Sequence, residues 1–287
     1  MNYGMNMLLW TDDCTGPKFP PLFERLRKMG YDSVEIPILT VDDRKLAALA
    51  RALDGLGLGR SAATCLTLER NLIGEDRRQR RAGVEHLKRV VDASRLIGAN
   101  LLIGPVYASL GVFSGKPPSA QEWAWAVEGL REVAEYAAPA GVTLALEYLN
   151  RFEIYLLNCA EDTARMVRDV GHPNVRMMYD TFHAHIEEKS IAAAVEACKE
   201  VLVHVHVSEN DRSTPGRGGV RWGETWAALK KGGYGGRLVV EAFGQGLPGL
   251  AAATRIWRRM FEDEEGLARE ALAFMKASWE NSSPESA

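Results

Sequence analysis

The sequence of 287 residues lacks several features that would assign it to a class directly. Its four cysteines form no C-x-x-C pair and lie far apart, which argues against a zinc ribbon or a dense disulfide framework and indicates a reducing compartment. No run reaches the roughly 18 apolar residues of a transmembrane helix, and no basic stretch precedes the first apolar run. We therefore expect a cytoplasmic protein with no membrane partner.

The sequence also lacks a charge bias. It has 35 Lys and Arg residues against 38 Asp and Glu residues, which gives a formal net charge of -3. This balance offers a polyanion no electrostatic attraction, so we expect no nucleic-acid partner. Phosphate-binding turns of the GxGxxG or GxxxxGK[ST] type are absent after the first two candidate strands, which disfavours a doubly wound nucleotide-binding sheet.

What the sequence does contain is a regular alternation of short apolar segments with longer segments of helical periodicity. The candidate strands are 4–10, 33–38, 59–67, 100–106, 142–149, 175–181, 201–208 and 236–242. The candidate helices are 22–29, 41–56, 76–97, 120–140, 160–170, 191–200, 222–231 and 250–277. Eight such pairs predict an α/β protein with a single (β/α)8 TIM barrel over residues 1–280 and a short polar tail over 281–287.

Metal-ligand side chains end the last four candidate strands. They are Glu147, Asp180, His206 and Glu241. The carboxyl ends of barrel strands meet at one rim, where three carboxylates would repel one another unless a cation compensated. Three carboxylates and one imidazole suit Mn²⁺, Co²⁺ or Mg²⁺ better than a thiolate-preferring metal. The pattern predicts one divalent metal ion; the alternative is four unrelated charges in rim loops.

Further polar residues follow the same strands and are candidates to orient the ligands or to hold substrate hydroxyls. They are Glu153, His183, Glu209 and Arg212. His204 shares strand parity with His206, so we expect it one layer lower, as a hydrogen-bonded core histidine. The loop after the fourth strand is rich in Gly and Pro, and its Tyr107 and Phe113 either form an apolar wall against a sugar or pack the loop onto the rim.

Several segments carry a resemblance to a known family. They are Gly104-Pro105-Val106-Tyr107, residues 146–153 (LEYLNRFE), residues 179–183 (YDTFH), and residues 209–212 followed by Pro215-Gly216-Arg217-Gly218. Over nearly its whole length the chain resembles the xylose-isomerase-like barrel superfamily, and within it the ketose 3-epimerases that act on tagatose, psicose and related sugars. Where many of these enzymes read H-x-G-E-x-N-R, this chain has Ser208 for Gly and Asp211 for Asn, so the preferred sugar is open.

The resemblance implies a role for each candidate residue. Glu147, Asp180, His206 and Glu241 would bind one divalent metal, usually Mn²⁺ or Co²⁺. Glu147 and Glu241 would also be the acid/base pair that epimerises a ketose at C3 through a cis-enediolate. Glu153, His183 and Arg212 would hold the hydroxyls near O1 to O3. The resemblance further implies a homodimer or a homotetramer.

Three other functions are compatible with the sequence. An aldose–ketose isomerase would use the same metal site but move the proton between C1 and C2. A sugar-phosphate isomerase or epimerase would use Arg212, Arg217 and Arg221 to hold the phosphate, unless the last two are solvated loop residues. A sugar-binding protein without activity would keep the loop aromatics but would not need four metal ligands.

Overall fold

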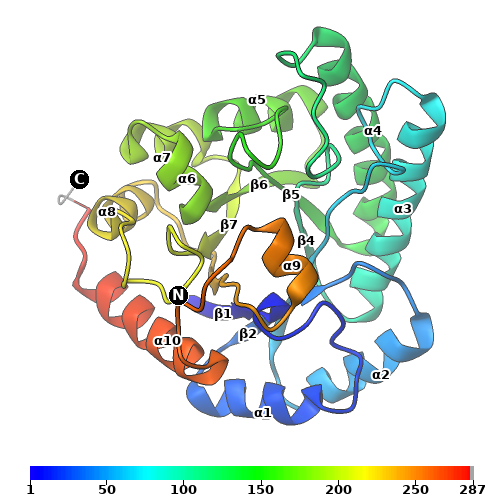
Figure 1. The fold of residues 1–287 in the computed structure, drawn as a ribbon. Coiled ribbons are helices and arrows are strands. Elements are labelled where there is room, and N and C mark those ends of the chain that lie inside the picture. Colours follow the sequence, from blue (N-terminus) through cyan, green and yellow to red (C-terminus); the bar gives the residue numbers. More distant parts are fainter. Residues whose placement is uncertain (285–287) are drawn as a thin grey trace.

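The computed structural model describes residues 1–284, which form a closed barrel of parallel strands surrounded by helices (Figure 1). The strands are β1 (Asn2–Asn6), β2 (Ser33–Pro37), β3 (Gly59–Ala63), β4 (Leu101–Gly104), β5 (Thr143–Glu147), β6 (Val175–Asp180), β7 (Leu202–Val207) and β8 (Arg237–Val240). Each strand pairs with the next one along the chain, and β8 pairs with β1 to close the ring. The α/β class and the (β/α)8 barrel are confirmed.

Most helices form the outer ring of the barrel in Figure 1. They are α1 (Phe19–Met29), α2 (Asp43–Asp54), α3 (Arg77–Leu96), α4 (Ala120–Ala137), α5 (Ala160–Val170), α7 (Ile191–Cys198), α8 (Trp222–Lys231) and α10 (Glu264–Asn281). The connections hold two short helices, α6 (Thr181–Glu187) and α9 (Pro248–Ala253), and two 3-10 turns, η1 (Met7–Leu9) and η2 (Ala138–Ala140). Among residues 1–284, no helix is both long enough and apolar enough to cross a bilayer.

Local signals explain where several helices begin and end. The Asp42 side chain accepts hydrogen bonds from the first backbone N–H groups of α2, and Ser119 and Glu122 form a reciprocal capping box at the start of α4. Helices α1 and α5 end at Gly30 and Gly171, which both adopt the left-handed conformation that glycine tolerates best. The starts of α2 and α4 thus end βα loops, which lie on the side of the site, whereas the ends of α1 and α5 begin αβ loops at the opposite end of the barrel.

The prediction of one helix over residues 250–277 is wrong. The structure has α9 and α10 there, separated by residues 254–263. The Asp263 side chain accepts from Gly266 N and starts α10 anew. Trp257, in the segment between the two helices, is 68% exposed. Helix α10 runs to Asn281, the first residue of the predicted polar tail, and residues 285–287 of that tail lie outside the described residues.

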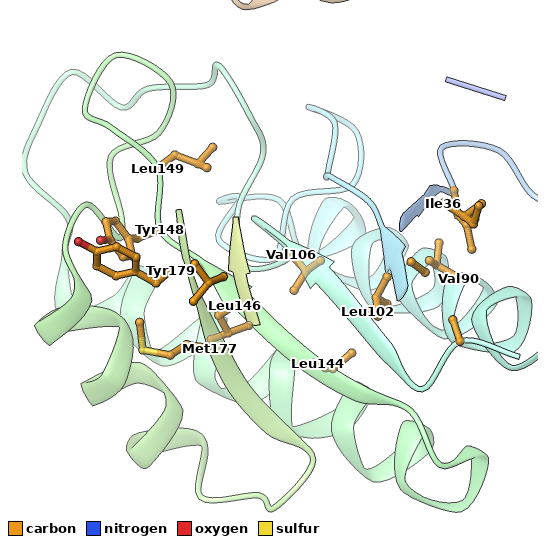
Figure 2. Close-up of a cluster of buried hydrophobic side chains, with 14 of the residues drawn as sticks. Ile36, Val90, Leu102, Val106, Leu144, Leu146, Tyr148, Leu149, Met177 and Tyr179 are labelled. Carbon is orange, nitrogen blue, oxygen red and sulfur yellow. The ribbon is translucent and has the colours of Figure 1, made fainter. Parts of the chain in front are cut away.

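Strand parity separates the two sides of the barrel wall. Leu144 and Leu146 of β5 point into the apolar layer between strands and helices, together with Met177 of β6 (Figure 2). Ala145, one position on, belongs to a separate small cluster inside the barrel. Because side chains alternate along a strand, Glu147 has the same inward direction as Ala145. The side chain of Glu147, the last residue of β5, therefore points into the mouth of the barrel.

We predict that Gly104, at the end of β4, cannot be replaced. Its φ is +129°, and an added Cβ would lie 2.1 Å from the carbonyl oxygen of Thr64. Gly104→Ala is therefore expected to lower the free energy of unfolding by about 3–5 kcal/mol, through backbone strain and overpacking. Gly111→Ala is the matched control, because Gly111 also has a positive φ but nothing within 4 Å of the added Cβ. It should lose about 1–2 kcal/mol; equal losses in urea unfolding would contradict this explanation.

Candidate active site

The four predicted metal ligands come together at the carboxyl ends of β5 to β8. They are Glu147, Asp180, His206 and Glu241, and their ligand atoms all lie within 4.8 Å of one another. His206 Nδ1 lies 3.4 Å from Glu241 Oε1, 3.6 Å from Asp180 Oδ2 and 3.9 Å from Glu147 Oε1. All four side chains are buried. Four consecutive strands thus deliver one ligand-type group each to a single point.

The chemistry of this cluster fits a divalent cation. Nδ1 of His206 is buried and, within the described part of the chain, has no hydrogen-bond partner of good geometry. It nevertheless faces the oxygens of three carboxylates. An unpaired imidazole nitrogen and three converging carboxylates leave a donor set that a borderline or hard divalent ion satisfies. These residues therefore form a candidate metal centre.

A second carboxylate layer lies below the candidate metal centre and was not anticipated. Glu35, in the middle of β2, is fully buried, and its Oε1 lies 2.6 Å from His206 Nε2. Its Oε2 accepts from Ser61 Oγ at 2.8 Å and lies 3.0 Å from His204 Nε2. Burial alone would raise the pKa of Glu35, but the imidazoles of His206 and His204 lower it well below its usual range. His204 is buried one layer below His206, in the place that strand parity predicted.

Asn6 connects Glu35 to the rim. Its Nδ2 donates to Glu35 Oε1 at 2.9 Å and to Glu241 Oε1 at 3.3 Å. Strand pairing explains why these side chains lie at the same level of the barrel. Asn6 pairs with Glu35 in the β1–β2 register, and Glu35 pairs with Ser61 in the β2–β3 register. A charged residue in the middle of a short apolar strand was the available signal for Glu35.

We predict that Glu35 sets the orientation of His206. A carboxylate on Nε2 fixes the imidazole so that Nδ1 faces the other carboxylates, and such partners typically contribute 10–100-fold to metal affinity. Glu35→Gln is therefore expected to weaken Mn²⁺ binding by about 10–100-fold in calorimetric titration. Ser61→Ala, which removes a hydrogen bond to Glu35 but leaves the His206 contact, should change the affinity much less. Parental affinity in Glu35→Gln would exclude the role.

Three further predicted residues, Glu153, His183 and Arg212, lie beside the candidate metal centre, and Asn150 joins the first two. The Asn150 backbone N–H donates to His183 Nδ1 at 2.9 Å, and its side-chain amide donates to Glu153 Oε1 at 2.8 Å. Burial, with a contribution from the Arg212 guanidinium, lowers the pKa of His183 to about 3, so its ring is neutral. Its Nε2 lies 3.8 Å from Glu147 Oε1. The same Nε2 lies 3.1 Å from Arg212 Nη2, so the ring also contacts the Arg212 guanidinium.

Arg212 is held in one conformation by charge and by aromatic rings. Its Nη1 donates to Glu241 Oε2 at 2.6 Å and to Asp180 Oδ2 at 3.2 Å. The guanidinium carbon lies 3.7 Å from the centroid of Phe182 and 4.8 Å from that of Phe243. The backbone of Arg212 has a φ of +65°, an uncommon value for a residue with a side chain. Stacking and ion pairs maintain this conformation.

The two glutamates of the cluster that line the cavity have pKa values shifted in opposite directions. Burial, and then the charge of Glu241, raise the pKa of Glu147 well above its usual range. Burial acts in the same direction on Glu241, but His206 and Arg212 outweigh it and lower the pKa of Glu241 to about 2. The two pKa values are thus shifted in opposite directions, and pairs of carboxyl groups with such divergent pKa values are typical of acid/base catalysis.

A cavity of about 150 Å³ opens above the cluster. Its charged and imidazole lining consists of Glu147, Glu153, His183, Arg212 and Glu241. The remaining lining is mainly apolar and includes Leu8, Leu39, Ile103, Leu110, Phe243 and Leu250. Every charged or imidazole group that lines the cavity was singled out from the sequence, whereas most of the apolar lining was not.

Tyr107 and Phe113 do not line this cavity, in contrast to the expected apolar wall. Tyr107 is fully buried, and its hydroxyl donates to the carbonyl of Leu157 at 3.4 Å. Phe113 is 47% exposed and its ring contacts that of Tyr155, with centroids 6.3 Å apart. Both side chains therefore pack the loop after β4 against the segment that follows β5, which agrees with the alternative that they pack the loop onto the rim.

Glu209 organises the loop after β7 instead of facing the cavity. Its buried carboxylate accepts hydrogen bonds from the backbone N–H groups of Asn210, Gly216 and Val220 and from Trp222 Nε1. The carboxylate thus closes the loop on itself. Because Arg212 is part of the same loop, this closure helps to place its guanidinium.

Comparison with known proteins agrees with this geometry. A family model described as "Xylose isomerase-like TIM barrel" matches residues 23–278. The D-psicose 3-epimerase of Agrobacterium fabrum is 30% identical over 96% of this chain and 98% of its own length. The L-ribulose 3-epimerase of Methylomonas sp. is 30% identical over 96% of this chain and 97% of its own length.

Solved structures give the same result. A structure of an L-ribulose 3-epimerase matches with a TM-score of 0.90 and 29% identity, over 98% of this chain and 95% of the other. A D-allulose 3-epimerase from Methylomonas sp. in complex with D-allulose also matches with a TM-score of 0.90 and 29% identity, over 97% of both chains. On the extent of the family match and of these similarities, the chain belongs to the xylose isomerase-like TIM barrel family.

Proposed function

We propose that this protein is a metal-dependent ketose 3-epimerase. The observation that carries the proposal is the pair Glu147 and Glu241, which line one cavity, share a candidate metal centre and have pKa values shifted in opposite directions. Relatives named as D-psicose and L-ribulose 3-epimerases, at 30% identity over nearly the whole chain, support the same reaction. The substrate is a free ketose, and the product is its C3 epimer.

Glu147, Asp180, His206 and Glu241 would hold one divalent ion, with Mn²⁺ or Co²⁺ favoured and Mg²⁺ as the alternative. When bound, such an ion supplies Lewis-acid stabilisation of the negative charge that develops on the substrate oxygens as the C3 proton leaves. Asp180 and His206 do not line the cavity, so their part is to hold the ion. Glu147 and Glu241 reach both the ion and the cavity.

The two glutamates would then move the proton. Glu241, ionised, takes the C3 proton on one face of the sugar, and Glu147, protonated, gives a proton to the other face of the planar enediolate. The two residues come from strands β5 and β8, three positions apart around the ring, so they can flank that plane. In the reverse direction the roles exchange, as inversion at C3 requires.

The neighbouring polar groups would bind the sugar. The Arg212 guanidinium is a donor, the Glu153 carboxylate is an acceptor, and the neutral His183 ring offers a third polar contact. The Asn150 bridge and the aromatic rings around Arg212 keep these groups in place, which limits the freedom lost on binding.

The phosphate alternative finds less support. Arg217 Nη2 pairs with Glu270 at 2.8 Å, Arg221 Nη1 pairs with Glu224 at 3.0 Å, and neither arginine lines the cavity. Arg212 lines it but is already engaged by two carboxylates. The expected homodimer or homotetramer is a further proposal, which sedimentation would test.

Product analysis separates the proposed reaction from its alternatives. We expect Mn²⁺-loaded protein incubated with D-psicose to form D-fructose, its C3 epimer, as resolved by chromatography. Formation of an aldose would indicate an aldose–ketose isomerase. Turnover of ketose phosphates alone would indicate the phosphate alternative, and binding without turnover would indicate a sugar-binding protein.

A further inference from the structure

The lining of the cavity is divided between two halves of the barrel. All its charged and imidazole groups come from β5 to β8 and the segments that follow them. The opposite side, which we call the apolar wall, consists of Leu8, Leu39, Ile103, Leu110 and Leu250. Four of these come from β1 to β4 and the segments after them, and Leu250 comes from α9. Leu8 and Leu250 pack against the same small cluster as Phe243, which places α9 beside η1.

Three polar side chains lie near the apolar wall. Two of them are hydrogen-bonded to backbone carbonyl groups, and the third is a weak hydrogen-bonding group. Thr64 Oγ1 donates to the carbonyl of Ile38 at 2.8 Å, and Thr254 Oγ1 donates to the carbonyl of Leu250 at 2.8 Å. The third is the Cys65 thiol, a weak donor and a weak acceptor. Among the described residues that line this side, none carries a charge or a side-chain amide.

We propose that the enzyme prefers a ketohexose without a hydroxyl on its terminal carbon, a 6-deoxyketohexose. This inference rests on the proposed function, because O1 to O3 must face the polar half for the reaction at C3. The chain from C4 to C6 then extends toward the apolar wall. A terminal methyl group would pack there against Leu39 and Leu110, whereas a terminal hydroxyl would lose its water without gaining a strong partner.

A matched pair of sugars tests the inference from the substrate side. D-psicose and 6-deoxy-D-psicose differ by one oxygen atom, at C6. We expect kcat/KM of the Mn²⁺-loaded enzyme to be at least about tenfold higher for the 6-deoxy sugar. An equal or higher kcat/KM for D-psicose would overturn the inference and leave the 3-epimerase proposal intact. Epimerisation of neither sugar, nor of any other free ketose, would overturn both.

A matched pair of variants tests the inference from the protein side. The two sugars adopt different ring forms in solution, and this difference affects kcat/KM of every variant in the same way. A difference between variants in the ratio of the two kcat/KM values therefore comes from the protein. Leu39 is 38% exposed at the cavity, and Leu96 of α3 is 39% exposed away from it. Leu39→Gln places an amide at the apolar wall and should lower the ratio of 6-deoxy to parent sugar severalfold, whereas Leu96→Gln should leave it unchanged. Equal ratios in both variants would overturn the inference.

Discussion

Replacing Glu147 or Glu241 with glutamine is expected to lower kcat by at least ~10²-fold, because glutamine can neither remove nor return the C3 proton. Both residues line the cavity and neither is needed to close the barrel, so the far-UV spectrum should be unchanged. The comparison is made at saturating Mn²⁺, since both residues are also candidate ligands. Glu224→Gln, which affects only an exposed pair with Arg221, should retain full activity.

The two variants should also differ from each other. With Glu147 replaced, Glu241 can still take a proton from one face and return a deuteron to it, so we expect deuterium exchange without inversion. That exchange should occur with only one of the two C3 epimers, and Glu241→Gln should show it with the other epimer. Near-normal turnover in both variants would show that these glutamates are not the acid/base pair.

Removal of the metal is expected to abolish turnover, with activity restored by Mn²⁺ or Co²⁺. In the metal-free protein, nothing replaces the charge stabilisation that loss of the C3 proton requires. Binding should also stabilise the fold, because an ion that binds only the folded state at 100 times its Kd adds about 2.7 kcal/mol. For a chain of 287 residues, that corresponds to a rise in Tm of roughly 4–5 °C.

Asp180→Asn provides the control for this measurement. Asp180 belongs to the buried cluster but does not line the cavity, so in the proposed mechanism it would hold the metal and take no part in proton transfer. The variant should show neither the rise in Tm nor metal-dependent activity at the Mn²⁺ concentration that saturates the parent. Full activity of the metal-free parent protein would contradict a metal-dependent reaction.

The barrel and the polar half of the site were predictable because both follow simple periodic rules. Alternation of apolar strands and amphipathic helices indicated the βα repeat, and parallel strands bring their carboxyl ends to one rim. Glu147 and Asp180 end apolar strands, so their convergence followed from the fold alone. His183 and Arg212 follow these strands at short distances, which kept them near the same rim.

The remaining features depend on contacts that sequence periodicity does not encode. Glu35 lies in the middle of β2, and only the register with β1 and β3 shows that it lies beneath His206. The directions of Tyr107 and Phe113 depend on how their loop folds back, with Tyr107 reaching the Leu157 carbonyl. The five residues of the apolar wall come from four separate parts of the chain, among them a short helix, α9, that was predicted as part of one longer helix.

The most direct test of the central claim is proton exchange at C3 followed by NMR in D₂O. Metal-free protein is reconstituted separately with Mn²⁺, Co²⁺ or Mg²⁺ and incubated with a panel of free ketoses. We expect deuterium at C3 together with the C3 epimer, only when metal is present. Exchange confined to C1 or C2 with formation of an aldose, or no metal-dependent exchange with any free ketose, would contradict the 3-epimerase assignment.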